Sequence, residues 1–253
     1  MTGGARGIGR GIAEQMVARG ARVVLTDLDG EAAARTAAEI GAVEGLAHDV
    51  RDPEAHRAVA QVAARHGRVA AWFNNAGVGF DGTLSELSDE QVRTLVEVNL
   101  LGVLWGTRAA IDAFAESGGD IVNTASLSGH GPVPGLSVYA ATKAAVVSLT
   151  MSVQAETPRG VRVHALCPDG VSTQMVADMH PDGMARALVQ SGGRMLGVDE
   201  VAAQAVALLG SRRVIRTLPA WRGALMRAST LAPSQSQRLT AVFAAQGRRA
   251  GRS

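Results

Sequence analysis

Several residue types are scarce in this sequence, and each scarcity narrows what the chain can be. Its single cysteine, Cys167, excludes an intrachain disulfide. No apolar run is long enough to span a bilayer, and together these absences favour a cytoplasmic location. Aromatic residues make up 3% of the chain and apolar residues 47%, so Ala, Val and Leu must fill the core. A length of 253 residues fits one α/β domain.

Acidic residues are absent from the C-terminal part of the chain. Residues 211–253 contain nine Arg and no Asp or Glu, whereas the preceding residues hold 16 basic and 23 acidic side chains. The pI near 9.3 therefore reflects the tail and does not indicate a nucleic-acid-binding body. The tail also carries apolar residues, namely Trp221, Leu225, Met226, Leu231, Leu239, Val242 and Phe243. It could pack on its own or a neighbouring subunit, which we favour, or lie on an anionic membrane surface.

Lysine, tyrosine and asparagine are equally scarce. The chain is rich in Ala, Gly and Arg, which is typical of a GC-rich genome that disfavours the codons of these three residues. Where they do occur, they are candidates for a functional role. These positions are Lys143, Tyr139, Asn74, Asn75, Asn99 and Asn123.

The glycine-rich loop at the start of the sequence has no strand before it. The loop Thr2–Gly9 is preceded only by Met1, whereas a phosphate-binding glycine loop normally follows a buried strand. Burying four or five strand side chains is worth roughly 6–15 kcal/mol, which equals the net stability of a typical domain, about 5–15 kcal/mol. We therefore expect the written sequence to be truncated at its N-terminus, with at most a stub at residues 1–2 where the first strand belongs.

Strand and helix patterns alternate along the rest of the chain. Buried strands are predicted at 22–26, 70–74, 120–124 and 161–166, and weaker ones at 43–47 and 214–218. Helical patterns occupy 9–20, 52–67, 89–117, 138–156 and 199–210. This alternation predicts an α/β fold with a doubly wound parallel sheet covered on both faces. We expect a single catalytic domain over 1–218, followed by a basic amphipathic extension over 219–253.

The glycine loop points to a dinucleotide. Gly3, Gly7 and Gly9 permit a tight turn and let the backbone approach a pyrophosphate, and the following helix offers its first N–H groups to the negative charge. A plain glycine turn is the alternative, because glycine patterns alone are weakly specific.

Carboxylates after the first two predicted strands indicate which dinucleotide is bound. Asp27 can accept hydrogen bonds from both ribose hydroxyls of NAD and would repel the 2′-phosphate of NADP. A helix cap is the alternative, for which Asp29 is better placed, and Arg6 would soften the preference by meeting a 2′-phosphate. Asp49 could accept from the adenine amino group or lie in a surface turn. Asn74 and Asn75 end a strand, where they are expected to face the ligand crevice. A pair of turn-forming asparagines is the alternative, which the scarcity of Asn disfavours.

Ser126, Tyr139 and Lys143 form the most specific constellation. Tyr139 and Lys143, four residues apart, share one face of a helix. An ammonium near a phenol lowers the pKa of the phenol, which suits proton exchange with a carbonyl or alcohol. Ser126 follows a strand and can bond the same substrate oxygen. A surface Tyr–Lys pair is the alternative, but it would bring together the only Tyr and the only Lys by chance.

These motifs resemble those of the short-chain dehydrogenase/reductase family. The family's TGxxxGxG matches Thr2–Gly9, its NNAG matches Asn74–Gly77, and its helix Asn matches Asn99. Its Ser and YxxxK motif match Ser126 and Tyr139–Lys143 at the family's spacing of thirteen residues. The resemblance covers about residues 2–218 and implies a Rossmann-type fold.

The resemblance also implies roles for individual residues. Tyr139 would be the catalytic acid/base, Lys143 would bind the nicotinamide ribose and tune Tyr139, and Ser126 would position the substrate oxygen. Asn99 would support a proton relay through water, and hydride would pass between nicotinamide C4 and the substrate carbon. The implied cofactor-binding residues are Gly3, Arg6, Gly7, Ile8, Gly9, Asp27, Asp49, Val50, Asn75, Ala76, Gly77, Tyr139, Lys143, Pro168 and Thr173. No metal is implied. The family further implies a homodimer or homotetramer that pairs the helices at 101–117 and 138–156.

The chain departs from the family pattern at three places. Asp169 interrupts the usual Pro-Gly after Pro168, which would add negative charge near the nicotinamide or shift the turn. His164 stands where the family often has Asn, and a packed histidine is favoured over a new catalytic one. The usual glycine-rich C-terminal ending is absent.

The segment between Thr173 and Leu196 is expected to cover the substrate. It contains four methionines and other apolar residues, namely Met175, Met179, Met184, Met195, Val176, Leu188 and Leu196. Because methionine is adaptable and apolar, a hydrophobic secondary alcohol or ketone is the hypothesis, with ordinary lid packing as the alternative.

Two other functions stay open. One is a catalytically silent NAD-binding scaffold or sensor, which an intact Ser–Tyr–Lys set argues against, and the other is a membrane-surface interaction protein. No nucleic-acid partner is expected.

Overall fold

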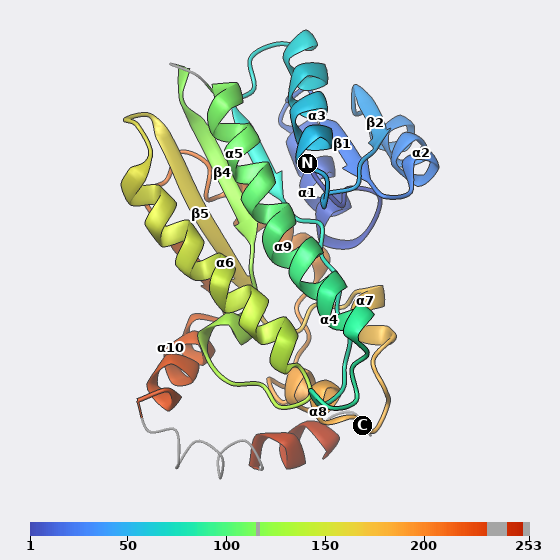
Figure 1. Cartoon of the computed structure of the whole chain (residues 1–253), viewed down its shortest axis with the longest axis vertical. Coiled ribbons are helices and arrows are strands. Elements are labelled where there is room, and N and C mark those ends of the chain that lie inside the picture. Colours follow the sequence, from blue (N-terminus) through green and yellow to red (C-terminus); the bar gives the residue numbers. More distant parts are fainter. Residues whose placement is uncertain (115–116, 232–241, 250–253) are drawn as a thin grey trace.

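The computed structural model describes residues 1–114, 117–231 and 242–249 (Figure 1). In that part of the chain the strands are β1 (Val24–Asp27), β2 (Glu44–Ala47), β3 (Ala71–Asn74), β4 (Gly119–Thr124), β5 (Val161–Pro168) and β6 (Ile215–Leu218). The helices are α1 (Gly7–Ala18), α2 (Gly30–Ile40), α3 (Pro53–Arg65), α4 (Asp89–Val96), α5 (Gly102–Phe114), α6 (Ser137–Glu156), α7 (Gln174–Ala177), α8 (Met184–Gln190), α9 (Val198–Val206) and α10 (Ala220–Ser229). The π-helix η1 (Glu97–Leu101) joins α4 to α5, and the 3₁₀ helix η3 (Leu127–His130) follows β4.

The structure confirms the predicted strands and corrects two helices. All six strands lie where the apolar runs predicted them, with ends shifted by at most two residues. The single helix predicted over 89–117 is instead three successive helices, because η1 interrupts it with wider turns. Helix α2 was not predicted. Its start is capped by Asp29, whose carboxylate accepts from the Ala32 N–H at 2.9 Å, and it ends at Gly41 with φ 77°.

Residues 1–2 join two groups of parallel strands. β1 pairs with β2, and β3, β4, β5 and β6 pair in that order. Between β1 and β3, the Met1 carbonyl accepts from the Thr26 N–H at 2.8 Å, and the Thr2 N–H donates to the Phe73 carbonyl at 3.1 Å. Thr2 also forms a parallel bridge with Thr26. The expected stub is therefore present, and its backbone hydrogen bonds link β1 to β3.

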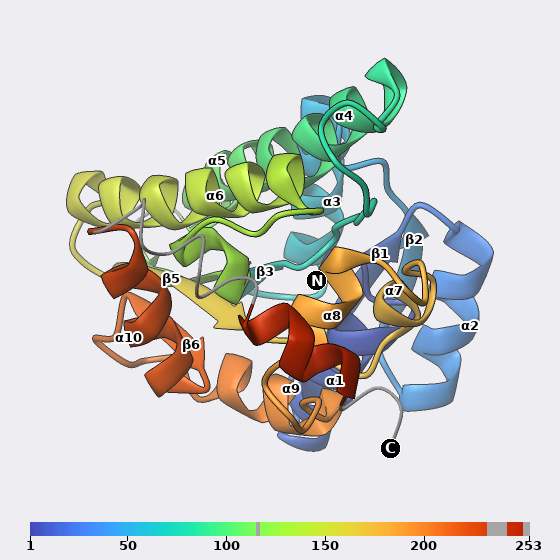
Figure 2. The same cartoon turned by 90° about the horizontal axis from the view of Figure 1, so that it is seen from below.

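Helices cover both faces of this sheet (Figure 2). α3, α5 and α6 lie on one face, and α1 and α9 lie on the other. Neighbouring strand residues serve opposite layers, because side chains alternate along a strand. Trp72 packs with Phe114 of α5, whereas Phe73 packs with Ile12 of α1 and Val201 of α9. Strands buried on both faces explain the nearly continuous apolar runs in the sequence.

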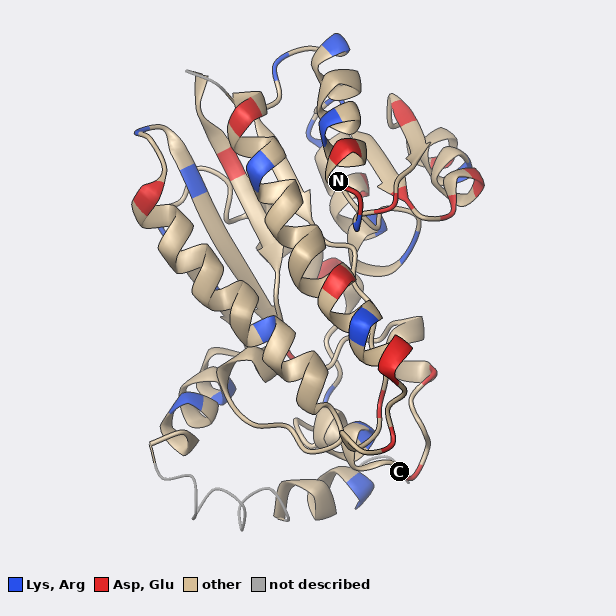
Figure 3. Cartoon of the chain, viewed as in Figure 1, with Lys and Arg blue, Asp and Glu red and all other residues tan. Residues whose placement is uncertain are grey.

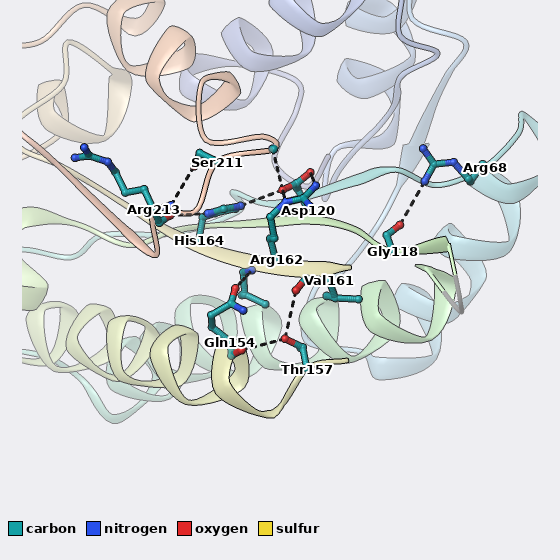
Figure 4. Close-up of polar contacts among 12 residues, drawn as sticks. Arg68, Gly118, Asp120, Gln154, Thr157, Val161, Arg162, His164, Ser211 and Arg213 are labelled. Atoms are coloured by element: carbon teal, nitrogen blue, oxygen red, sulfur yellow. Dashed lines mark hydrogen bonds and ion pairs between the residues drawn. The ribbon is translucent and has the colours of Figure 1, made fainter. Parts of the chain in front are cut away.

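A charged network lies at the amino ends of β4 and β5 (Figure 4). Asp120 accepts from Arg162 Nε at 2.7 Å and Nη2 at 2.8 Å, from His164 Nε2 at 3.1 Å, and from the Gly210 N–H at 3.1 Å. The other ring nitrogen of His164 lies 2.7 Å from the Arg213 carbonyl. Burial opposes ionisation of Asp120, but the bonds from His164 and Arg162 outweigh it and hold its pKa well below the usual range. His164 is thus a packed residue, as favoured from the sequence.

The described part of the C-terminal extension packs on the domain. α10 lies against β6 and η3, and Gly223 contacts Thr217 of β6. In the segment 242–249, Ala244 is buried and Gly247 lies against the backbone of Ala187 in α8. Both described pieces carry only basic charge, whereas acidic residues gather around α2 and the loops near it (Figure 3). Among the helices in the described ranges, none has the length and apolar character to cross a membrane.

Candidate active site

A cavity of about 780 Å³ lies at the carboxyl ends of β1, β3, β4 and β5. Its position matches the rule that ligands of open α/β sheets bind beyond the carboxyl ends of the strands. The predicted site residues that line it are Gly3, Arg6, Gly7, Ile8, Asp27, Asp49, Val50, Asn75, Ala76, Gly77, Ser126, Tyr139, Lys143, Pro168 and Thr173. Gly9 and Asn99 do not line it. The structure therefore gathers nearly the whole predicted set into one cavity.

The glycine loop is held tightly against the end of β3. Gly3 has φ 63°, and a Cβ there would lie 2.8 Å from Ala76 Cα. A Cβ on Gly9 would overlap the Gly3 carbonyl oxygen, so Gly9 acts by packing and not by lining the cavity. Asn75 Nδ2 donates to the same Gly3 oxygen at 3.1 Å, and the Thr2 hydroxyl accepts from the Asn75 N–H at 3.0 Å. With the first turn of α1 facing the cavity, this cradle suits a diphosphate.

Two carboxylates, Asp27 and Asp49, also line the cavity. Asp27 accepts from the Ala5 N–H at 3.2 Å, which fixes its side chain at the tip of β1. Asp49 is bound by Arg51, whose Nη2 lies 2.6 Å from Oδ2, and this pair lowers the pKa of Asp49. Arg51 was not predicted as the partner that orients Asp49, although a basic residue two positions away was a visible signal. Arg6 also lines the cavity, at the start of α1.

Ser126, Tyr139 and Lys143 all line this cavity. Lys143 Nζ donates to the Thr124 carbonyl at 2.9 Å, and the Ser126 hydroxyl accepts from the Ser128 N–H at 3.2 Å. Burial raises the pKa of Tyr139, and the nearby Ser126 hydroxyl offsets this only in part. Burial also lowers the pKa of Lys143 to about 8. The expectation that Lys143 lowers the pKa of Tyr139 is therefore wrong for this structure, because desolvation dominates and Nζ lies 5.6 Å from the ring centroid.

Asn99 acts on the loop after β3. Its Oδ1 accepts from the Val78 N–H and its Nδ2 donates to the Val78 carbonyl, each at 2.9 Å. The side chain is fully buried within η1, and a Cβ on Gly77 would lie 3.2 Å from its oxygen. The side chain of Asn99 thus positions the loop at Gly77 and Val78. The proposed role in a water relay stays a prediction.

Asn74 is a core residue, contrary to the expectation that both asparagines face the crevice. Its Oδ1 accepts from Trp72 Nε1 at 2.8 Å, and its Nδ2 donates to Asn123 Oδ1 at 2.9 Å. Asn123 in turn donates to the Thr150 hydroxyl at 3.0 Å. Because strand residues alternate between faces, only Asn75 reaches the cavity. Two of the four rare asparagines therefore build a buried network beneath the site.

Asp169 lines the cavity but its charge is paired. Arg222 Nε lies 2.9 Å from its Oδ2, and both side chains are nearly buried. Burial raises the pKa of Asp169, while Arg222 acts in the opposite direction. The predicted extra negative charge is thus balanced by a residue of the C-terminal extension, which the sequence analysis did not identify.

The segment expected to cover the substrate contributes only part of its methionines. Met175, Met179, Val176 and Leu188 line the cavity, whereas Met184, Met195 and Leu196 do not. Met184 is 43% exposed, and Leu196 packs in the core. The expected apolar cover is therefore narrower than the sequence suggested.

Comparisons with known proteins agree with this geometry. A sequence model of the family described as short chain dehydrogenase matches residues 1–184. The probable oxidoreductase EphD of Mycobacterium tuberculosis is 34% identical over 251 residues, which is 85% of this chain and 42% of EphD. The chain thus spans about two fifths of the length of these first relatives. Sorbitol dehydrogenase of Cereibacter sphaeroides is 39% identical, covering 73% of this chain and 72% of that enzyme. The crystal structure of a short-chain dehydrogenase/reductase from Burkholderia phymatum in complex with NAD has a TM-score of 0.80 at 30% identity, covering 93% of each chain.

Proposed function

The chain belongs to the short-chain dehydrogenase family, and from this premise we propose that it is an NAD(H)-dependent oxidoreductase acting on apolar ketones and secondary alcohols. One observation carries the proposal. Ser126, Tyr139 and Lys143 line the same cavity as the glycine cradle and Asp27. The Ser–Tyr–Lys set can exchange a proton with a substrate oxygen, and the glycine cradle with Asp27 can hold a dinucleotide.

The residues at the dinucleotide end fit NAD. Gly3 and Gly9 leave room that any Cβ would fill, and the α1 N-terminus favours the negative charge of a diphosphate. The Asp27 carboxylate is held in place to accept from ribose hydroxyls, and it would repel a 2′-phosphate. Arg6 opposes that preference from the same end of the cavity. We propose that Asp27 prevails and that NAD is preferred over NADP.

The residues at the catalytic end are suited to donate a proton at neutral pH. When bound, the nicotinamide supplies or accepts the hydride. Because burial raises the pKa of Tyr139, its phenol is protonated near pH 7 and can protonate the oxygen of a ketone as that oxygen gains charge. The Ser126 hydroxyl lies near this phenol and is placed to hold the substrate oxygen beside it. Lys143, bound to the Thr124 carbonyl, adds positive charge next to the developing oxyanion.

The substrate end of the cavity favours an apolar molecule. Besides the methionines, its walls include Val133, Leu136 and Val189. Apolar walls of this kind bind a substrate by removing its surface from water. We therefore propose an uncharged substrate whose reacting carbonyl or hydroxyl is its end nearest Tyr139.

The test is a screen of purified protein with both cofactors. NADH and NADPH binding is measured by fluorescence, and turnover is measured at 340 nm against a panel of ketones and secondary alcohols. The proposal expects tighter NADH binding and turnover of apolar ketones. Tight NADH binding with no turnover on any panel member would instead support a silent NAD-binding scaffold. Tighter NADPH binding would show that Arg6 outweighs Asp27.

A further inference from the structure

One wall of the cavity comes from the C-terminal extension. α10 contributes Arg222, Leu225, Met226 and Ser229 to the lining. Their spacing of three, one and three residues places them on one face of the helix. Trp221, on the same helix, does not line the cavity and is 59% exposed. Helix α10 therefore has a distinct cavity face, which its amino-acid pattern encodes.

A nearly buried ion pair fixes this helix to the turn after β5. Arg222 and Asp169 have side chains only 11% and 12% exposed, and their atoms Nε and Oδ2 lie 2.9 Å apart. Arg222 Nη2 also donates to the Ser191 hydroxyl at 3.0 Å, just beyond α8. A Cβ on Gly192 would overlap Nη1 of the same guanidinium. One arginine thus holds together three segments that are distant in the sequence.

The chemistry of the wall excludes some ligands and favours others. Asp169 already balances the charge of Arg222, so this wall offers no free cation to an anionic substrate. Leu225 and Met226 present apolar surface beside the ion pair. The segment 242–249 adds Phe243 to the lining. An uncharged aliphatic or alicyclic group is the partner that such a surface binds.

We propose that α10 is the substrate-selecting wall of this enzyme, in which Leu225 and Met226 contact the apolar part of the substrate remote from its reacting carbon and Arg222 positions the helix through Asp169. This inference rests on the proposed function for the identity of the reacting end. It further specifies which part of the substrate α10 contacts and which residues limit the length of that part.

Equilibrium binding of 2-alkanones to the protein saturated with NAD⁺, from which a ketone cannot receive a hydride, tests the wall directly. Calorimetry with a series from butanone to 2-dodecanone should show affinity rising about fourfold per methylene, which corresponds to about 0.8 kcal/mol. The rise stops where the chain meets α10. Met226→Ala should extend the rise by about three carbons, the number of heavy atoms removed. Leu225→Trp should shorten it, and Trp221→Ala, on the exposed face of the same helix, is the matched control and should change nothing.

A second set of variants tests the positioning role of Arg222. Arg222→Gln and Asp169→Asn should each flatten the dependence of affinity on chain length. Combining the two changes should restore it, because a neutral pair leaves no buried charge without a partner. Gly192→Ala should act like Arg222→Gln. Gly197→Ala is its control, because a Cβ there meets nothing within 4 Å.

The outcomes separate this inference from the proposed function. Affinity that does not depend on chain length, or equal effects of Met226→Ala and Trp221→Ala, would overturn the role of α10. Single and double variants of the ion pair that behave alike would overturn the role of Arg222. Ketones that bind with the expected length dependence but are never reduced would leave the wall intact and refute the proposed oxidoreductase activity.

Discussion

Replacing Asp120 by Asn should destabilise the fold strongly while leaving the active site working. The Asp120 side chain is 9% exposed and bonds Arg162, His164 and the Gly210 N–H. Removing one member of a buried ion pair costs about 3–5 kcal/mol. Because the Arg162 side chain is 38% exposed and partly solvated, we place the loss near the lower limit, about 3 kcal/mol. For a chain of this size, about 2–4 °C per kcal/mol gives a Tm lower by about 6–12 °C.

The pH dependence of the same variant provides an independent check. The pKa of Asp120 is held well below its usual range, so the ionised carboxylate stabilises the fold at any pH above the unfolded value, about 3.9. That stabilisation is lost as the pH falls below about 4, because the unfolded chain then binds a proton at Asp120 that must be released when the chain folds. The difference in stability between the parent and Asp120→Asn should therefore be constant near neutrality and shrink in acid.

Urea denaturation and calorimetry at several pH values measure both effects. The control is Glu54→Gln, which breaks an exposed ion pair with Arg57 and should cost less than about 0.5 kcal/mol. NADH binding at low temperature should be unchanged in both variants, since the network lies at the amino ends of β4 and β5 and the cavity at the carboxyl ends. A Tm for Asp120→Asn equal to that of the control, or a loss that persists undiminished in acid, would refute the reasoning.

Three further predictions concern the cavity. Asp27→Ala should narrow the ratio of NADPH to NADH dissociation constants about 5- to 150-fold, a coupling of about 1–3 kcal/mol, and an unchanged ratio would show that Asp27 does not face the ribose. Gly9→Ala should abolish NADH binding because its Cβ overlaps the Gly3 oxygen, whereas Gly197→Ala should bind normally; equal binding would remove the cradle from the site. The kcat/KM for ketone reduction should fall above about pH 8 as the buried Lys143 loses its proton, and a level profile from pH 6 to 10 would contradict a role for the ammonium.

Much of the fold could be read from the sequence because its strands are buried on both faces. The run from Ala71 to Asn74 serves two layers at once, so it is apolar throughout and easily recognised. Helix α2 was missed for the opposite reason. Its buried face consists of Ala33, Thr36 and Ala37, and such small residues give a weak periodic signal. Local patterns therefore predict an element well only when large apolar residues mark its buried face.

The site was predictable where the motif itself fixes the geometry. Tyr139 and Lys143 share a helix face by their spacing, and the structure places both in the cavity. Long-range packing was not predictable. The pairing of Asp169 with Arg222 depends on how α10 docks on the domain, and the raised pKa of Tyr139 depends on burial that a spacing does not encode. Asn74 points into the core and Asn75 into the cavity because side chains alternate along β3. Predicting which residue does which would have required knowing exactly where β3 ends.

The central claim is that Tyr139 exchanges a proton with the substrate in an NAD(H)-dependent reaction. The most direct measurement compares the parent protein with Tyr139→Phe for ketone turnover and for NADH binding on the same preparations. The account predicts turnover lower by about 10²–10⁴-fold and an NADH dissociation constant within about twofold of the parent. Turnover that survives the loss of the hydroxyl, in a variant that binds NADH normally, would contradict it.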